Sequence, residues 1–298
     1  MIANRRAMAE TASELYVRES GAPSAPAVVF VHGGGPNGAM WARHLEALRG
    51  TFHCLAPDLP GFGRSHRLPS ISLPDTADLL VELIRTRVPS GRAHVVGLSY
   101  GGSVVFGLLA RHAEAIDRAV IDGAGPFTSR SDRFIVAGAM LVSPLMGRGI
   151  ARVALRSVGL TGLGESLRSA SGGAIRRAWS EGFLAPVSEA QTLAPSPTLL
   201  VAGERETLVR ASNAAFAALM PSAEAAFVPG LGHAWFAWRP ELHILMVEAW
   251  LSGAPLPGGL SPEPPNAQAV SRLRELLARR RKGDPWAACP MVPPLPPA

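Results

Sequence analysis

The residues best suited to chemistry lie at 97–101, where the chain reads Gly-Leu-Ser-Tyr-Gly. An apolar run over 93–98 predicts a strand before Ser99, and the apolar stretch 101–112 predicts a helix after it. So sharp a turn has no room for side chains two residues either side of the serine, and glycine relieves that crowding. Ser99 is therefore predicted to be a nucleophile that attacks a carbonyl carbon. The alternative is a glycine-rich turn with an incidental serine.

A histidine late in the chain is the predicted general base. Serine attacks only when a base takes its proton, and the pKa of histidine suits this task. His233 ends the loop Gly-Leu-Gly-His at 230–233, between a predicted strand and a predicted helix. The other seven histidines lie in strands, on helix faces or in other loops. We therefore expect His233 to serve Ser99.

Two acidic residues compete to orient this histidine. Glu206 follows the predicted strand 198–202, and the chain order Ser99, Glu206, His233 matches that of a serine–acid–histidine triad. Asp122 ends an earlier predicted strand and is the alternative acid. Glu206 has a structural interpretation as well, because an acid at a helix N-terminus is stabilised by the helix dipole. We predict Glu206 as the triad acid, with Asp122 kept open.

A second glycine-rich loop predicts an oxyanion hole. Residues 32–36 read His-Gly-Gly-Gly-Pro after the predicted strand 27–31. Glycines let the backbone approach a ligand and leave N–H groups free, so we assign the oxyanion hole to Gly34 and Tyr100, with Gly33 as an alternative to Gly34. A plain turn is the other interpretation. A phosphate loop is not favoured, because no Gly-Lys-Ser/Thr follows.

Strands and helices alternate along most of the chain, which predicts a parallel sheet covered by helices on both faces. Strands are predicted over 14–19, 27–31, 53–56, 93–98, 118–121, 198–202 and 223–228, and helices over 41–48, 73–88, 101–112, 208–219 and 240–251. Residues 126–196 break the rhythm with helical stretches and predict a lid. We expect the substrate pocket to be lined by Met140, Leu141, Leu145 and Trp235.

Three segments divide the chain. Residues 1–13 are predicted to be a flexible leader, and residues 14–253 form the main domain with its lid. Residues 254–298 are rich in proline and basic, and we expect a disordered tail.

The composition points to a globular protein and against several classes of partner. The net charge is +6, but half of this excess falls in 254–298 and no basic stripe carries interleaved aromatics, so nucleic acid is not an expected partner. No apolar run reaches membrane-spanning length, and two cysteines make no disulfide framework, which favours the cytoplasm. We expect a small-molecule substrate and neither metal nor cofactor, and the oligomeric state stays open.

Taken together, these motifs resemble the α/β-hydrolase superfamily over roughly residues 14–253. The resemblance rests on the His-Gly start at 32–33, the loop 58–65, the elbow around Ser99 and the Gly-His pair at 232–233. It implies a mostly parallel sheet of eight strands flanked by helices, a helical cap after the sixth strand, and a Ser–His–acid triad. The acid loop departs from the usual Gly-Glu-x-Asp, because Glu206 stands where aspartate is usual.

The expected activity is hydrolysis of a small, largely apolar ester through an acyl-enzyme on Ser99. By resemblance, a serine at this position argues against epoxide hydrolases and haloalkane dehalogenases. The glycine loop is similar to that of carbon–carbon bond hydrolases, which leaves cleavage of a diketone as an alternative. A non-catalytic ligand-binding protein on the same scaffold is another, and the basic tail is a further candidate for docking to a membrane or an acidic partner.

Overall fold

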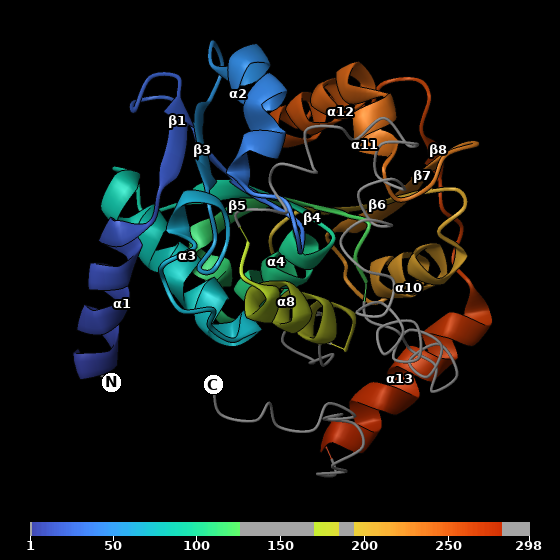
Figure 1. Ribbon diagram of the computed structural model, residues 1–298. Coiled ribbons are helices and arrows are strands. Elements are labelled where there is room, and N and C mark those ends of the chain that lie inside the picture. Colours follow the sequence, from blue (N-terminus) through green and yellow to red (C-terminus); the bar gives the residue numbers. More distant parts are fainter. Residues whose placement is uncertain (1, 126–169, 185–193, 282–298) are drawn as a thin grey trace.

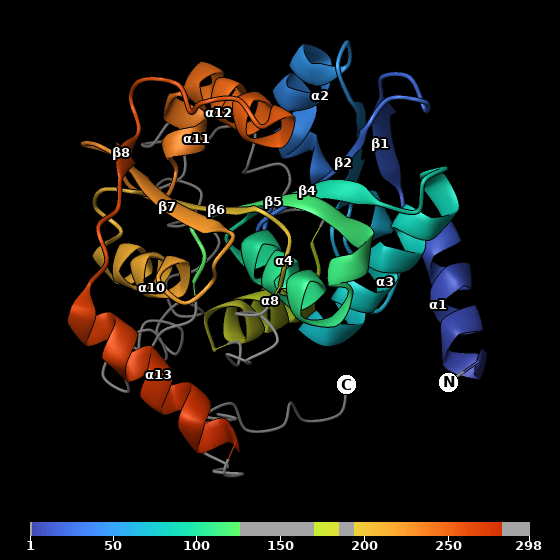
Figure 2. The ribbon, with the colours of Figure 1, turned by 180° about the vertical axis from the view of Figure 1, so that it is seen from behind.

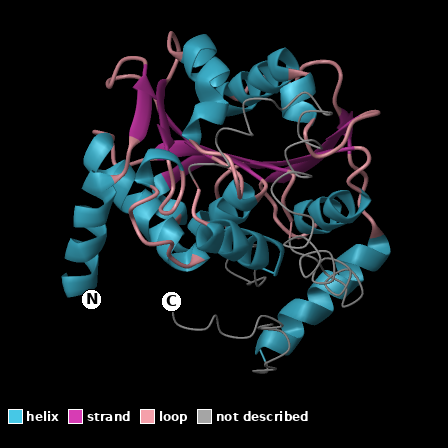
Figure 3. Cartoon of the chain, viewed as in Figure 1, coloured by secondary structure: helices cyan, strands magenta, loops and turns pink. Residues whose placement is uncertain are grey.

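The computed structural model describes residues 2–125, 170–184 and 194–281, which form one sheet with helices on both faces (Figures 1 and 3). The strands are β1 (Val17–Ser20), β2 (Ala27–Val31), β3 (His53–Pro57), β4 (Ala93–Leu98), β5 (Ile116–Asp122), β6 (Thr198–Gly203), β7 (Ala223–Val228) and β8 (Ser261–Pro262). The eight-stranded, mostly parallel sheet that the resemblance implied is confirmed.

The order of the strands puts the glycine-rich loops side by side. The sheet runs β1-β3-β2-β4-β5-β6-β7-β8, and only β1 and β8, at its two edges, pair in antiparallel fashion. Strand β2 lies between β3 and β4, so the direction in which the chain builds the sheet reverses there. Val31 at the end of β2 pairs with Gly97 near the end of β4. Parallel sheets bind ligands at such a reversal, beyond the carboxyl ends of the strands.

Helices cover the sheet in two groups. The helices are α1 (Ile2–Glu14), α2 (Ala42–Leu48), α3 (Leu73–Arg87), α4 (Tyr100–Arg111), α8 (Gly172–Leu184), α10 (Thr207–Ala217), α11 (Trp235–Trp238), α12 (Pro240–Ser252) and α13 (Ala267–Arg281), with short 3-10 turns at Gly38–Trp41, Gly63–Ser65 and Ala113–Ala115. Helices α2, α11 and α12 lie on one side of the sheet, and α3, α4, α8 and α10 on the other (Figures 1 and 2).

Alternate side chains of the strands build two separate cores. Val29 and Val31 of β2 pack into the core beneath α3 and α4, whereas Val28 and Phe30 pack into the core beneath α2 and α12. Because both faces are covered, β2 and β4 are buried along their whole length, and β2 is continuously apolar.

The sequence predicts a flexible leader over residues 1–13, and the structure has α1 over Ile2–Glu14. Ala12 and Leu15 are buried against Leu79 of α3. The segment lacks a strong amphipathic pattern, so this docking is set by contacts far away in the sequence.

The first part of the expected disordered tail carries a strand and a helix in the structure. Strand β8 pairs with β7, and α13 packs against α10 through Ala269, Val270 and Leu273. These three side chains fall on one helical face, and their burial orders residues that composition alone assigns to a tail. Residues 282–298 lie outside the described part.

Most of the predicted lid lies outside the described residues. Helix α8 is the longest part of the lid that the structure describes. The break in the described chain follows β5, the fifth strand, and not the sixth. The count differs because no strand precedes β1 in the described chain, and β8 completes the eight at the opposite edge.

Candidate active site

Ser99 occupies a strained turn between β4 and α4. Its φ of 55° is the one positive value at a residue other than glycine in the described chain. Its N–H donates to the carbonyl oxygen of Asp122 at 2.8 Å, and its carbonyl accepts from the N–H of Ser103 at 3.1 Å. A left-handed backbone at a non-glycine residue costs energy and persists only where the surroundings enforce it. The turn lifts the hydroxyl above the carboxyl edge of the sheet.

The glycines beside Ser99 are required by close packing. A Cβ at Gly97 would lie 2.3 Å from the carbonyl oxygen of Gly101, and one at Gly101 would lie 2.2 Å from that of Val31. Both contacts are with backbone atoms, which cannot move aside. The glycines therefore allow the elbow to sit against β2.

The structure brings His233 and Glu206 together. Nδ1 of His233 lies 2.6 Å from Oε1 of Glu206, and the other carboxylate oxygen accepts from the N–H of Gly203 at 2.7 Å. The Glu206 side chain is 9% exposed and that of His233 is 49% exposed. The carboxylate is thus held on one side by β6 and presents its free oxygen to the imidazole.

This contact changes the basicity of the imidazole. Burial acts to lower the pKa of His233, but the hydrogen bond and the charge of Glu206 outweigh it, so the pKa is raised above 6.5. With Nδ1–H donating to Glu206, the neutral ring carries its lone pair on Nε2. That nitrogen is the one able to take a proton.

The rival acid has different partners. Asp122 is fully buried, and its Oδ1 accepts from Nε1 of Trp235 at 2.9 Å. Within the described residues its carboxyl group makes no hydrogen bond to His233. Geometry therefore favours Glu206 over Asp122 as the acid that contacts the imidazole.

Ser99 and His233 flank the same glycine. Gly123, with φ of 61°, lines the pocket together with Ser99, and a Cβ there would lie 2.8 Å from both Nδ1 and Cε1 of the imidazole. The described residues show no hydrogen bond between Ser99 Oγ and His233. Such contacts are often long in unliganded enzymes and tighten when substrate binds.

The loop after β2 is held from below by His32. Its Nε2 accepts from the N–H of Leu59 at 2.9 Å, which leaves Nδ1–H to donate to the carbonyl of Gly33 at 2.8 Å. Burial lowers the pKa of His32 to about 4, so the ring is neutral, as this pattern requires. The Gly33 carbonyl belongs to the peptide whose N–H is that of Gly34. In a trans peptide the N–H points away from the carbonyl, so the N–H of Gly34 is directed away from His32.

The backbone at the start of α4 offers a second donor. Tyr100 is the first residue of that helix, and its N–H has no acceptor within the helix. A Cβ at Gly33 would lie 3.5 Å from Cβ of Ser99, so the glycine loop and the elbow are adjacent. The arrangement offers backbone N–H groups near the Ser99 hydroxyl.

Asp58 anchors both neighbouring loops. Its fully buried carboxylate accepts from the N–H groups of Gly38 and Arg64 and pairs with the Arg18 guanidinium at 2.5 Å. The Arg64 side chain stacks over Tyr16 instead of pairing with Asp58.

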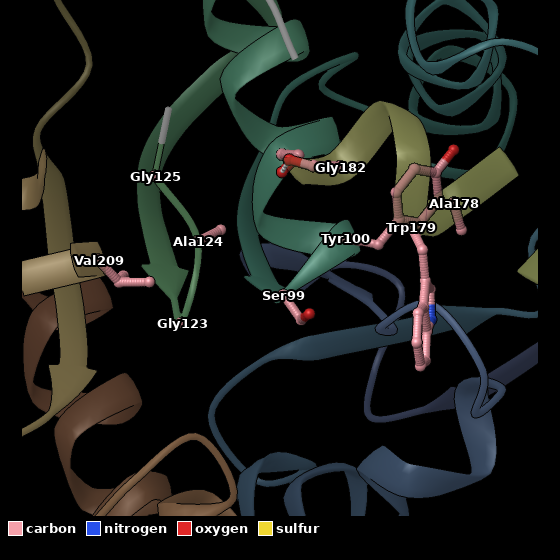
Figure 4. Close-up of a pocket in the computed structure, with 10 residues that line it drawn as sticks. Ser99, Tyr100, Gly123, Ala124, Gly125, Ala178, Trp179, Gly182 and Val209 are labelled. Carbon is pink, nitrogen blue, oxygen red and sulfur yellow. Dashed lines mark hydrogen bonds between the residues drawn. The ribbon is translucent and has the colours of Figure 1, made fainter. Parts of the chain in front are cut away.

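A pocket of about 320 Å³, including open solvent, surrounds the Ser99 hydroxyl (Figure 4). Its described lining is Ser99, Tyr100, Ser103, Gly123, Ala124, Gly125, Ala178, Trp179, Gly182 and Val209. Small side chains dominate, and Trp179 forms the wall opposite Val209 (Figure 4).

Helix α8 carries one wall of this pocket and is tied down at three points. Trp179 Nε1 donates to the Gly34 carbonyl at 2.5 Å, and Ser103 Oγ donates to the Gly182 carbonyl at 2.9 Å. Glu181 accepts from the N–H of Leu73 at the start of α3. Sequence reasoning missed Trp179, because no motif marks a pocket residue within a lid.

Trp235 was expected to line the pocket, but it is fully buried in the core under α12. Helix α11 begins at this residue and turns its ring away from the pocket toward His243, whose ring centroid is 4.9 Å away. The other expected pocket residues, Met140, Leu141 and Leu145, lie outside the described residues.

The described chain holds no cluster of three or more His, Cys, Asp or Glu side chains arranged to bind a metal ion. Within the same residues, no helix combines the length and the apolar character needed to cross a membrane.

The comparisons with known proteins agree on the fold. A family model described as alpha/beta hydrolase fold matches residues 26–147, which include the glycine loop and Ser99. An enol-lactonase from Burkholderia xenovorans LB400 has a similar structure, with a TM-score of 0.63 and 19% identity over 80% of this chain and 96% of that one.

Curated relatives match over a shorter length. An AB hydrolase superfamily protein of Gibberella zeae is 31% identical over 107 residues, 36% of this chain and 38% of that protein. A pimeloyl-(acyl-carrier protein) methyl ester esterase of Vibrio vulnificus is 36% identical over 101 residues, 34% of this chain and 38% of that protein. The matched part of the chain thus spans little more than a third of the length of these relatives.

Proposed function

Because the chain belongs to the α/β-hydrolase superfamily, we propose that it is a serine hydrolase acting on a small, largely apolar ester or related acyl compound. One observation carries the proposal: the strained Ser99 elbow lies beside an imidazole that is already hydrogen-bonded to a carboxylate. The names of the relatives support the ester. One is a methyl ester esterase and one structural neighbour is an enol-lactonase.

The reaction proceeds in two acyl transfers. Nε2 of His233 takes the proton of the Ser99 hydroxyl as its oxygen attacks the carbonyl carbon. The oxyanion is stabilised by the N–H groups of Tyr100 and of Gly34, or Gly33 in its place, and His233 then protonates the departing alcohol. A water molecule, deprotonated by His233, attacks the acyl-enzyme and releases the acid, with Ser99 reprotonated.

The test is the removal of the nucleophile. We expect the purified protein to hydrolyse short p-nitrophenyl esters and to react with a fluorophosphonate probe, and Ser99→Ala to lose labelling and about 10⁴-fold or more of kcat. The matched control is Ser90→Ala, which removes an exposed serine hydroxyl from another loop. Full turnover in Ser99→Ala would contradict the proposal.

The same preparation separates the alternatives. A carbon–carbon bond hydrolase, which the glycine loop at 32–36 resembles, would cleave a vinylogous 1,5-diketone faster than an aryl ester. A pure binding protein would react with neither compound and label weakly or not at all.

A further inference from the structure

Asp122 holds the nucleophile from its main chain. It ends β5 in register with Leu98 of β4, and its carbonyl accepts the N–H of Ser99 at 2.8 Å. The following residue, Gly123, donates its N–H to the carbonyl of Val201 in β6 at 2.9 Å. The end of β5 is therefore fixed from both sides where it supports the elbow.

The side chain of Asp122 reaches to the opposite side of the sheet. Oδ1 accepts from Nε1 of Trp235 at 2.9 Å, and Oδ2 lies 3.3 Å from Nε2 of His243. All three side chains are fully buried. Trp235 is two residues beyond His233 and begins α11, so this bond fixes the downstream end of the histidine loop.

We propose that Asp122 is a positioning residue, whose main chain holds Ser99 while its side chain, through Trp235, holds the loop of His233. The proposal rests on the function proposed above. It explains a fully buried carboxyl group that does not contact the imidazole. It also explains how two loops far apart in sequence keep one geometry, since Gly123 lies directly against the His233 ring.

The buried position of Asp122 disfavours its charged form. Burial, followed by the negative charge of Glu206, raises the pKa of Asp122 well above its usual value, which favours the protonated form over the carboxylate. Burial also lowers the pKa of His243 to about 3, and that ring is neutral. Oδ2 of Asp122 lies 3.3 Å from Nε2 of His243 without the geometry of a hydrogen bond, and Nδ1 of His243 is hydrogen-bonded to Nε2 of His44 at 2.8 Å.

Several titratable and charged groups surround the Asp122 side chain. Glu206 and His233 face Asp122 from the site, His243 faces it from α12, and His44 in α2 has Arg43 beside it. Of the two carboxyl groups, that of Glu206 is the one in contact with His233.

Three variants test the proposal by kcat, KM and pH profile on an aryl ester. Asp122→Asn keeps an acceptor for the indole N–H of Trp235, and we expect it to retain most of kcat and the pH profile of the wild type. Asp122→Leu and Trp235→Phe remove the bond, and we expect kcat to fall by about 10²-fold with KM little changed, as when a catalytic group is misplaced. Asp117→Leu is the matched control, an aspartate at the exposed end of β5 paired with Arg92.

A second readout does not depend on activity. In NMR spectra, we expect the indole N–H of Trp235 to be protected from exchange in the wild type and in Asp122→Asn, and exposed in Asp122→Leu. The titration of His233 is expected to match the wild type in Asp122→Asn and to shift in Asp122→Leu and in Trp235→Phe. If Asp122→Leu does not fold, Trp235→Phe decides, because it keeps a ring in the core.

Two results would overturn the inference. One is a loss in Asp122→Asn as large as in Glu206→Gln, which would make Asp122 a second charged acid. The other is wild-type kcat and His233 titration in both Asp122→Leu and Trp235→Phe. If the wild type neither hydrolyses esters nor labels with fluorophosphonate, the proposed function fails, and the NMR comparison still decides whether Asp122 positions His233.

Discussion

Glu206 reaches His233 although it stands where aspartate is usual in the superfamily. Its backbone lies at the N-cap of α10, and one of its carboxylate oxygens is held by the N–H of Gly203. The side chain therefore folds back over the end of β6, and this path accommodates its extra methylene group. The second oxygen meets Nδ1 of His233 at 2.6 Å and leaves Nε2 for the substrate.

The pH dependence of activity follows from this contact. A general base works only when it is unprotonated, so kcat/KM should fall as the pH drops through the pKa of His233, which lies above 6.5. Glu206→Gln removes the charge that raises this pKa. We expect its acidic limb to move to lower pH and kcat to fall by about 10²–10⁴-fold.

The control for this variant lies on the same loop. Glu204→Gln loses an equal charge, but the carboxylate of Glu204 accepts from the N–H of Gly230 and does not contact the imidazole. Its acidic limb should stay in place. A wild-type limb in Glu206→Gln would show that another group orients His233.

At the level of elements, the site depends on the close approach of β2, β4 and the first turn of α4. Gly101 touches the carbonyl of Val31, and the same contact places the glycine loop after β2 beside Ser99. A helix that begins directly beneath the nucleophile also directs the positive end of its dipole toward the developing oxyanion. Nucleophile and oxyanion donors are thus placed by one packing contact.

Substitutions at two glycines of α4 distinguish the effect of this contact from the general effect of replacing a glycine within a helix. A methyl group at Gly101 would lie 2.2 Å from a backbone oxygen, and we expect Gly101→Ala to reduce the free energy of unfolding by about 3 kcal/mol, the upper end for overpacking. At Gly107 the nearest atom is 3.1 Å away in the flexible Leu73 side chain, and alanine favours helix. Urea unfolding should therefore show little change for Gly107→Ala, and equal losses in the two variants would refute the contact.

At the scale of the whole molecule, the sheet is covered by segments from both ends of the chain. Helix α1 packs on α3, and α13 packs on α10 at the opposite side of the molecule (Figure 1). Leu273 is fully buried in the core on the α4 side, while Arg272 and Arg274 are exposed. The apolar face of α13 is therefore used within the fold. Docking of its basic face to a membrane or an acidic partner stays a prediction.

Leu273 tests whether α13 stabilises the domain. Leu273→Ala leaves a cavity in a packed core, and we expect it to reduce the free energy of unfolding by about 2–5 kcal/mol, with kcat unchanged below the transition. Arg274→Ala, on the exposed side of the same helix, should change it by less than about 0.5 kcal/mol. Equal urea midpoints for the two variants would show that α13 does not contribute.

The sequence alone determined the elements whose signals are local. Runs such as 27–31 and 93–98 are mostly apolar and contain β-branched residues, and they became β2 and β4 with the predicted limits. The Ser99 elbow was recognisable for the same reason, because the crowding that demands glycine at 97 comes from Gly101, within five residues, although the crowding at Gly101 comes from Val31.

Tertiary structure alone decided which partners these residues meet. Asp122 and Glu206 both follow parallel strands at one edge of the sheet, and only packing shows that Glu206 turns to His233 while Asp122 turns to Trp235. Trp235, Trp179 and Leu273 were misjudged or missed for a common reason. Whether such a side chain lines a pocket, closes a loop or fills a core depends on residues far away in the sequence, more than a hundred positions for Trp235 and Trp179, and no local pattern encodes those contacts.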